Sequence, residues 1–454
     1  MDTSNTAPSV SERPEAQQNA PHFARSFYVA NAMEIFERLA WYGFFTLSSL
    51  YMSNSPAAGG LGLTDTERGT IQGVIPFILY LLPVFTGALG DRYGYRKMFF
   101  VAFAIMTPAY YLLGQVTGFW PFFTVLLLVA VGAAIFKPLV VATVSRTTTD
   151  ENRSVGFGIF YTMINVGGFV GPIIAGVVKG ISWEWVFSVA AFWITINFLL
   201  LQFYADPATQ DSKPSTGSAR FNSVFRDIGT VLTDRSFVAY LLIMSGFWAC
   251  YNQLFLTLPL YIRDFVDTSP ILHQVEHFSP SIGHAIASQD GQQISPEFIT
   301  AFNFASILAL QIFISRRCRY IPSIPLIVIG TVVMAASFAW LGFGFLAGGV
   351  GVIGAVIVFS VGEMLASPKS QEYVAEVMPT ERAALFMGYY FLSMALGFLI
   401  AGLLSGWAYA TLVRTMNRPD LLWGAFSVLA LVTAAGQLWY HRRTIGNKQQ
   451  EHFQ

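Results

Sequence analysis

The chain has 454 residues, of which 54% are hydrophobic and only 11% are charged, whereas soluble globular proteins carry about 25% charged residues. Its 26 basic and 26 acidic residues cancel, which argues against nucleic-acid binding, because that depends on a surplus of basic groups. Aromatic residues and glycines are abundant, as they are in membrane helices. The composition therefore predicts an all-α membrane protein that crosses the bilayer many times.

Twelve apolar stretches have the length of about 20 residues that crosses a bilayer as a helix. They cover residues 26–52, 66–89, 98–116, 121–145, 154–178, 184–204, 236–262, 296–316, 322–346, 348–376, 381–411 and 420–440. The polar start of the chain lacks the short apolar core of a cleaved signal peptide, so we expect the first span to be retained.

The basic residues between the spans predict the orientation and the domains. With both termini in the cytoplasm, 18 of the 26 lysines and arginines lie inside, five outside and three within spans, as the positive-inside rule requires. We expect a cell-membrane protein with a tail at 1–25, a six-helix bundle at 26–204, a cytoplasmic linker at 205–235, a second bundle at 236–440 and a tail at 441–454. Such a layout favours a binding site between the bundles.

The sequence favours neither a metal centre nor an enzyme. His273, His277 and His284 fall in an outer loop at 263–295, but their spacing without nearby cysteines indicates a solvated loop. No nucleophile with a base beside it is visible in the spans. We therefore expect no cofactor, with a proton gradient as the only driving force.

Five charged residues fall near the middle of predicted spans, where each charge costs about 2.5–3.5 kcal/mol. Glu34, Glu37 and Arg38 share one face of the first span. Two carboxylates beside one guanidinium leave a surplus negative charge, which favours holding a proton; the alternative is a structural ion pair beside a neutral glutamate. Lys137 in span 4 and Glu363 in span 10 come from opposite halves of the chain, an arrangement that suits a solute with an anionic and a cationic end.

The segment GALGDRYGYRK at 87–97 joins spans 2 and 3 on the predicted inner side. Its glycines permit a tight turn, and the charge of Asp91 suits a helix end. We expect Asp91, Arg92 and Arg96 to take part in gating where the two bundles meet on this side.

This segment resembles the loop between spans 2 and 3 of the major facilitator superfamily. Other motifs resemble those of the proton-dependent oligopeptide transporters within it: MEIFERLAWYG (33–43), IFKPLV (135–140), FYTMINVGG (160–168), SPEFI (295–299) and GEMLASP (362–368). The matches cover both halves of the chain and occur in the right order.

The resemblance implies a twelve-helix major facilitator fold that imports di- or tripeptides with protons by alternating access. It implies proton coupling by Glu34, Glu37 and Arg38, a substrate carboxylate held by Arg38 and Lys137, and a substrate amino group held by Glu363. Further cavity-lining residues would be Tyr42, Tyr161, Asn165, Trp248, Asn252 and Gln253. The expected partners are a peptide or other small solute, protons and membrane lipid, with a monomer as the working unit.

Two departures from the family separate this chain from many members. Asn252 stands where many carry an acidic residue, which removes the usual charge for closing the outer side. The extra helical pair of many bacterial members is not expected, because residues 205–235 are too polar and short. A proton-driven exporter of drugs or other metabolites, and a non-transporting membrane sensor or scaffold, remain open as alternatives.

Overall fold

The structure is a computed structural model that describes residues 23–149, 152–206, 233–344, 348–377 and 383–451. Helices make up these ranges almost entirely, and β structure within them is limited to one bridge between Ala287 and Ile294. The predicted all-α architecture is therefore confirmed. Most of the predicted linker, residues 207–232, lies outside the described residues.

The helices of the first half follow the first six predicted spans. They are α1 (Arg25–Ser53), the short η1 (Pro56–Ala58), α2 (Asp65–Leu81), α3 (Pro83–Tyr93), α4 (Tyr95–Leu113), α5 (Phe119–Arg146), α6 (Arg153–Lys179) and α7 (Trp183–Gln202). A capping box starts α2, because the Thr64 side chain accepts from the Glu67 amide while Glu67 accepts from Thr64. The second predicted span is divided into α2 and α3 just before Pro83.

The second half is more broken than the predicted spans. It contains α9 (Arg235–Tyr251), α10 (Gln253–Leu256), α11 (Leu258–Phe265), α12 (Ser269–Phe278), α13 (Pro280–Ile286), α14 (Pro296–Thr300), α15 (Phe302–Cys318), α16 (Ser323–Phe343), α17 (Gly348–Val377), α18 (Ala383–Ala408), the π-helix η2 (Tyr409–Thr415) and α19 (Pro419–Glu451). The predicted span 236–262 is interrupted at Asn252 and at Thr257. Pro259 lacks an amide hydrogen and crowds the preceding turn, which explains the second of these breaks. The predicted outer loop folds into α12 and α13, each with a proline in its first turn.

Ten helical stretches in the described ranges are long and apolar enough to cross a membrane by length and composition. The two predicted spans outside this set are α1 and α4. Both carry charges that lower their mean hydropathy: Glu34, Glu37 and Arg38 within α1, and Arg96 and Lys97 at the start of α4.

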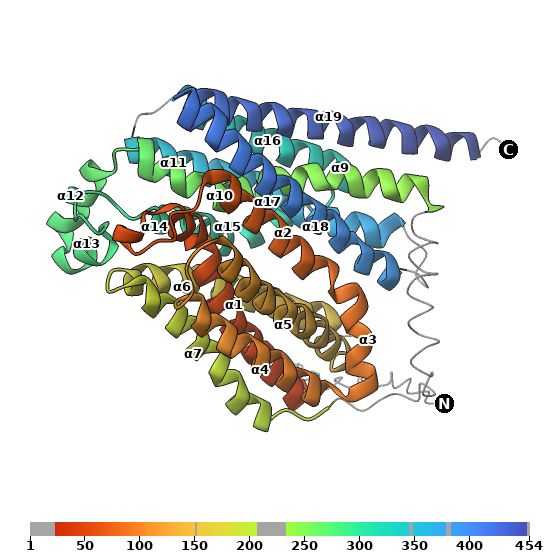
Figure 1. Ribbon diagram of the computed structural model, residues 1–454. Coiled ribbons are helices and arrows are strands. Elements are labelled where there is room, and N and C mark those ends of the chain that lie inside the picture. The colour runs from red at the N-terminus through yellow and green to blue at the C-terminus, as the bar shows by residue number, and fades with distance from the viewer. Residues whose placement is uncertain (1–22, 150–151, 207–232, 345–347, 378–382, 452–454) are drawn as a thin grey trace, which may run out of the picture.

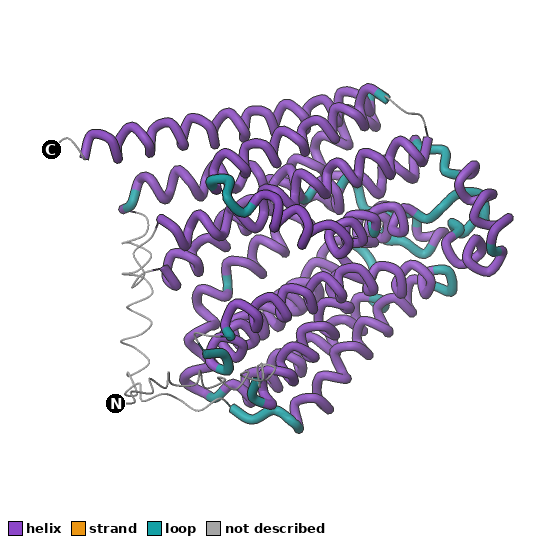
Figure 2. The backbone as a smooth tube through the Cα atoms, turned by 180° about the vertical axis from the view of Figure 1, so that it is seen from behind, coloured by secondary structure: helices purple, strands orange, loops and turns teal. Residues whose placement is uncertain are grey.

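The two halves lie side by side in Figure 1, with α4 to α7 below, α16 and α19 above, and α2 lying beside α18 between them. The start of α9 and the end of α19 lie toward one end of the molecule, whereas α12, α13 and α14 lie at the opposite end, as the reverse view in Figure 2 also shows. We call these the proximal and distal ends. Helices of opposite halves pack as α2 on α18, α6 on α14 and α15, and α1 on α10, α11 and α14.

Glycines allow α2 and α18 to pack backbone against backbone. Gly69 and Gly73 on α2 face Gly402 and Gly406 on α18, and a Cβ atom on Gly402 would collide with the α2 backbone. Each pair has the G-x-x-x-G spacing that brings membrane helices together, because small residues let the two backbones approach closely. The two halves are therefore held in direct contact along this helix pair.

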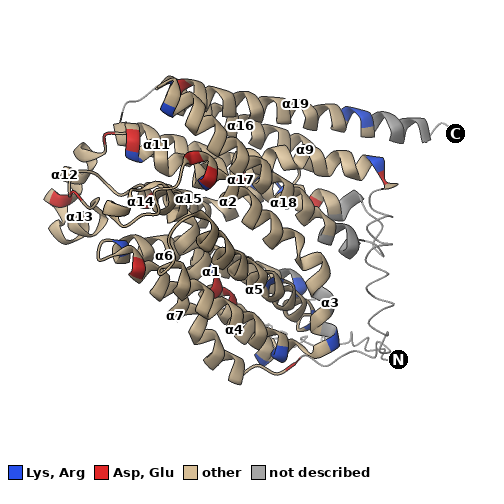
Figure 3. Cartoon of the chain, viewed as in Figure 1, with Lys and Arg blue, Asp and Glu red and all other residues tan. Residues whose placement is uncertain are grey.

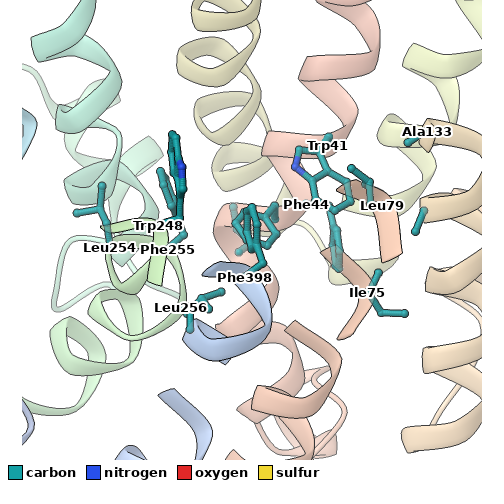
Figure 4. Close-up of a cluster of buried hydrophobic side chains, with 14 of the residues drawn as sticks. Trp41, Phe44, Ile75, Leu79, Ala133, Trp248, Leu254, Phe255, Leu256 and Phe398 are labelled. Carbon is teal, nitrogen blue, oxygen red and sulfur yellow. The ribbon is translucent and has the colours of Figure 1, made fainter. Parts of the chain in front are cut away.

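Aromatic side chains continue this contact toward the centre of the molecule. The Phe45 ring of α1 lies 6.0 Å from the Phe255 ring of α10 and 5.9 Å from the Phe398 ring of α18. Figure 4 shows Phe398 among the apolar side chains of both halves, between Trp248 and Phe255 on one side and Ile75 on the other.

We predict that Gly402→Ala destabilises the protein. Overpacking typically costs about 1–3 kcal/mol, so the melting temperature of the purified protein should fall by several degrees. Gly424 on α19 is the matched control, because open space surrounds its Cβ position and alanine is the better helix former. Equal melting temperatures for Gly402→Ala and Gly424→Ala would contradict the close packing of α2 on α18.

Candidate functional site

A charged cluster on α1 occupies the interior of the first half. Arg38 Nε lies 3.3 Å from Glu34 Oε1 and donates a 2.5 Å hydrogen bond to Glu37 Oε2. All three side chains are at least 96% buried. Figure 3 shows that most charged residues gather near helix ends, whereas acidic residues of α1 lie within its length. One guanidinium thus serves two carboxylates, as the spacing predicts.

Lys137 on α5 faces an aromatic ring instead of a carboxylate. Its ammonium lies 4.3 Å from the centre of the Tyr80 ring on α2, in a cation–π contact. Among the described residues, no carboxylate lies within ion-pair distance of Lys137, although Glu34 and Glu37 are close enough to influence it electrostatically. The Lys137 ammonium can therefore form an ion pair with an anionic group.

Tyrosines connect the basic side of the site to the second half. The Arg38 guanidinium lies 5.6 Å from the centre of the Tyr42 ring, and Tyr42 meets the Phe304 ring of α15 edge to face at 5.2 Å. Tyr80 stacks on Phe398 of α18 at 5.2 Å. The walls of the central site are consequently built from both halves.

Glu363 on α17 provides the acidic side. Its carboxylate accepts a 2.8 Å hydrogen bond from the Asn303 amide of α15 and another hydrogen bond from the Tyr251 hydroxyl. Asn303 also donates to Ser360 Oγ at 3.0 Å. No basic side chain among the described residues forms an ion pair with Glu363, so a cationic group of a solute is its natural complement.

The other predicted lining residues divide into two groups. Tyr161 on α6 is 42% exposed and lies within electrostatic range of Glu363 and Tyr42, and Asn165, one turn further on, donates to the Tyr161 carbonyl. Both belong to the central site, which we define as the α1 cluster with Tyr42, Tyr80, Lys137, Tyr161, Asn165, Tyr251, Asn303 and Glu363.

Trp248, Asn252 and Gln253 are engaged in packing. The Trp248 indole donates to the Tyr390 hydroxyl at 3.2 Å, and the Asn252 amide donates to the Trp248 carbonyl at 2.7 Å. Gln253 is fully buried and donates to the Ala401 carbonyl of α18. Direct contact of these three residues with a solute remains a prediction. Their packing contacts argue against it.

The predicted gating residues lie at the proximal end. The Arg92 and Arg96 side chains are exposed, and the Arg96 amide donates to Asp206 just after α7. The side chain of Asp91 lies outside the described ones. The contacts of the described residues of this loop are with Tyr93, Arg146 and Asp206, so its role in closing the proximal end remains a prediction.

Sequence reasoning missed Tyr80, Tyr251 and Asn303. Nothing in their local sequence separates them from the many other tyrosines and asparagines of the spans. Only the packing of α2 against α5, and of α9 and α15 against α17, brings them to Lys137 and Glu363.

At the distal end, charged side chains tie the two halves together. Lys179, at the end of α6, lies 2.5 Å from Glu297 Oε1 on α14, and both side chains are buried. Arg414 on η2 reaches Asp65 on α2 at 3.3 Å. Ion pairs thus join the two halves at the distal end without an acidic residue at position 252.

Two further arginines add hydrogen bonds across the same end. Arg68 of α2 is fully buried and donates to the Leu256 carbonyl at 3.1 Å and to Ser405 Oγ at 3.3 Å. Arg263 of α11 donates to Ser53 Oγ at 2.9 Å and to Asn54 Oδ1 at 2.7 Å. The distal end is thus closed by a network that spans both halves.

Comparison with known proteins agrees with this architecture. The sequence profile of the Major Facilitator Superfamily matches residues 33–288. The chain belongs to the major facilitator superfamily, a class of multi-pass membrane transporters.

Two relatives of about equal similarity have different functions. A peptide transporter of Yersinia enterocolitica is 23% identical over 88% of this chain and 91% of its own length. A multidrug resistance protein of the same species is 22% identical over 85% of this chain and 88% of its own length. A solved peptide transporter of the POT family, in complex with sulfate, has a TM-score of 0.75 at 18% identity, covering 92% of this chain and 94% of that one. This structural likeness confirms the major facilitator fold.

We predict that the Lys179–Glu297 pair stabilises distal closure. Lys179→Glu should lower the melting temperature by several degrees, because breaking a buried ion pair typically costs about 3–5 kcal/mol. The charge-swapped variant Lys179→Glu/Glu297→Lys should recover most of the loss. A swapped protein that melts no higher than Lys179→Glu alone would show that the pair does not act as a unit.

Proposed function

We propose that the chain is a proton-coupled symporter that imports small zwitterionic solutes, di- and tripeptides foremost, by alternating access. The observation that carries the proposal is the separation of charge at the central site. Arg38 and Lys137 belong to the first half, and Glu363, whose carboxylate forms no ion pair with a described basic residue, belongs to the second. A solute with a carboxylate and an ammonium complements both sides and draws the halves together.

Proton coupling is assigned to the α1 cluster. Glu34 and Glu37 share Arg38 in a buried setting, where the third charge lacks a full partner, so the cluster favours taking up one proton. Described residues of the spans include no histidine near the site. The coupling therefore has to involve a carboxylate, and loss of its proton on the opposite side would reset the cluster.

The orientation of the chain in the membrane is part of the proposal. We infer that the proximal end faces the cytoplasm, because the excess of lysines and arginines in the loops falls on that side. The distal closure would then shield the site from the outside. A single chain supplies both sides of the site, which supports a monomer as the working unit in the cell membrane.

A proton-driven exporter is the second candidate, and the similarity to a multidrug resistance protein favours it. An exporter of apolar drugs gains little from a site with opposite charges on opposite walls, since each charge left without a partner is costly to bury. Similarity to a peptide transporter, at a comparable level of identity, supports the importer.

We predict that both ends of a dipeptide contribute to its recognition. In proteoliposomes with an imposed inward proton gradient, labelled dialanine uptake should be inhibited by free dialanine at least tenfold better than by its N-acetylated or C-amidated form. A tenfold ratio corresponds to about 1.4 kcal/mol. Lys137→Ala should abolish the discrimination against the C-amidated form only, and Glu363→Gln that against the N-acetylated form only.

Equal inhibition by all three compounds would rule out the two-sided recognition of the solute. Absence of dialanine uptake, together with proton-driven extrusion of a lipophilic cation, would favour the exporter. Proteoliposomes that move neither compound would favour a sensor or scaffold.

A further inference from the structure

A second cavity lies at the closed distal end, separate from the central site. Its volume is about 280 Å³, near the lower limit of the 300–1,000 Å³ typical of small-molecule pockets. Its walls come from both halves: α1 and the α6–α7 turn on one side, α11 and the hairpin 287–294 on the other. None of its lining residues belongs to the central site.

The cavity is lined by groups that have hydrogen-bond donors to spare. Lys179 uses its ammonium on Glu297 and, at 3.4 Å, on Ser295 Oγ, which leaves one of three N–H groups. Trp183 is 5% exposed, and its indole N–H has no hydrogen-bond acceptor among the described residues. A buried donor without an acceptor is costly, so a cavity beside it favours an occupant that accepts hydrogen bonds.

Arg263 adds a second cation from the α11 side of the cavity. It donates to Asp264, Ser53 and Asn54, and the guanidinium has five N–H groups in all, so one remains. Lys179 and Arg263 together with the Trp183 indole are the donor set that a carboxylate requires.

The hairpin contributes the opposite charge. Asp290 lines the cavity, and hydrogen bonds from the Ser288 hydroxyl and the Gln292 amide hold the pKa of the Asp290 carboxyl below its usual range. It forms no ion pair with a described basic residue. The ammonium group of a bound solute would complement the Asp290 carboxylate. The carboxylate of the same solute would complement the donors of Lys179, Trp183 and Arg263.

We propose that this distal cavity is a second binding site for small zwitterions such as dipeptides, with the carboxylate toward Lys179, Trp183 and Arg263 and the ammonium toward Asp290. An extended dipeptide is about 7 Å long, which suits a cavity of this volume. The biological use of this site rests on the proposed function. If the chain imports such solutes, the site would hold a solute at the distal end before the central site becomes accessible. Its existence as a binding site does not depend on that function.

Calorimetric titration of the purified full-length protein with glycylglycine tests the site. The wild type should bind two molecules per chain, and Gln289→Trp should bind one, because Gln289 is an exposed hairpin residue that lines the cavity and a large side chain there fills it. Gln292→Trp is the matched control in the same hairpin, exposed but not part of the lining, and should bind two.

A second variant removes only the unused donor. Trp183→Phe keeps an aromatic ring against Tyr51, whose ring centre lies 5.0 Å away, but deletes the N–H. It should weaken distal binding about tenfold and leave the central site unchanged. N-acetylated glycylglycine should bind the distal site at least tenfold more weakly than glycylglycine in the variant Lys137→Ala/Glu363→Gln, which has lost the central site.

The outcomes separate this inference from the proposed function. If Gln289→Trp and Gln292→Trp bind the same number of molecules as the wild type, the distal site does not exist. If the wild type binds one molecule and Gln289→Trp binds none, the distal site stands and the central peptide site falls.

Discussion

A charge buried in a membrane span must find its partner within the protein, because lipid offers none. The central site is organised by this constraint. Arg38 is shared by Glu34 and Glu37 within one helix. Lys137 contacts the face of the Tyr80 ring, and Glu363 accepts hydrogen bonds from neutral side chains. These last two charges, on opposite halves, are the ones that a zwitterionic solute is suited to complete.

The packing of the halves decides from which side such a solute is admitted. Glycine contacts between α2 and α18 and ion pairs such as Lys179–Glu297 close the distal end. Both kinds of contact suit a reversible closure. Glycine surfaces are flat, so they separate without disturbing side chains, and ion pairs regain hydration when water enters. In the proposed cycle, completion of the central charges by the solute and a proton offsets the loss of the distal contacts.

The sequence predicted the helical spans and the charged residues of the central site well. Length and hydropathy mark a span directly, and a charge inside a span is conspicuous because it is costly. Tyr80 and Asn303 could not be predicted, since polar and aromatic residues are common in spans and only tertiary packing selects among them. The G-x-x-x-G pairs at 69–73 and 402–406 were visible in the sequence, but the spacing of two glycines does not predict which helix packs against them. Likewise, Lys179 and Glu297 lie 118 positions apart, so only the fold reveals that they form an ion pair.

The coupling of solute movement to proton movement is the central claim, and internal pH measures it most directly. In proteoliposomes with equal pH on both sides and the membrane potential clamped, adding dialanine outside should acidify the lumen. Glu37→Gln, which removes one carboxylate of the α1 cluster, should abolish the acidification while dialanine exchange between the two sides continues. A lumen that stays at constant pH during dialanine uptake by the wild type, or that becomes alkaline, would contradict symport.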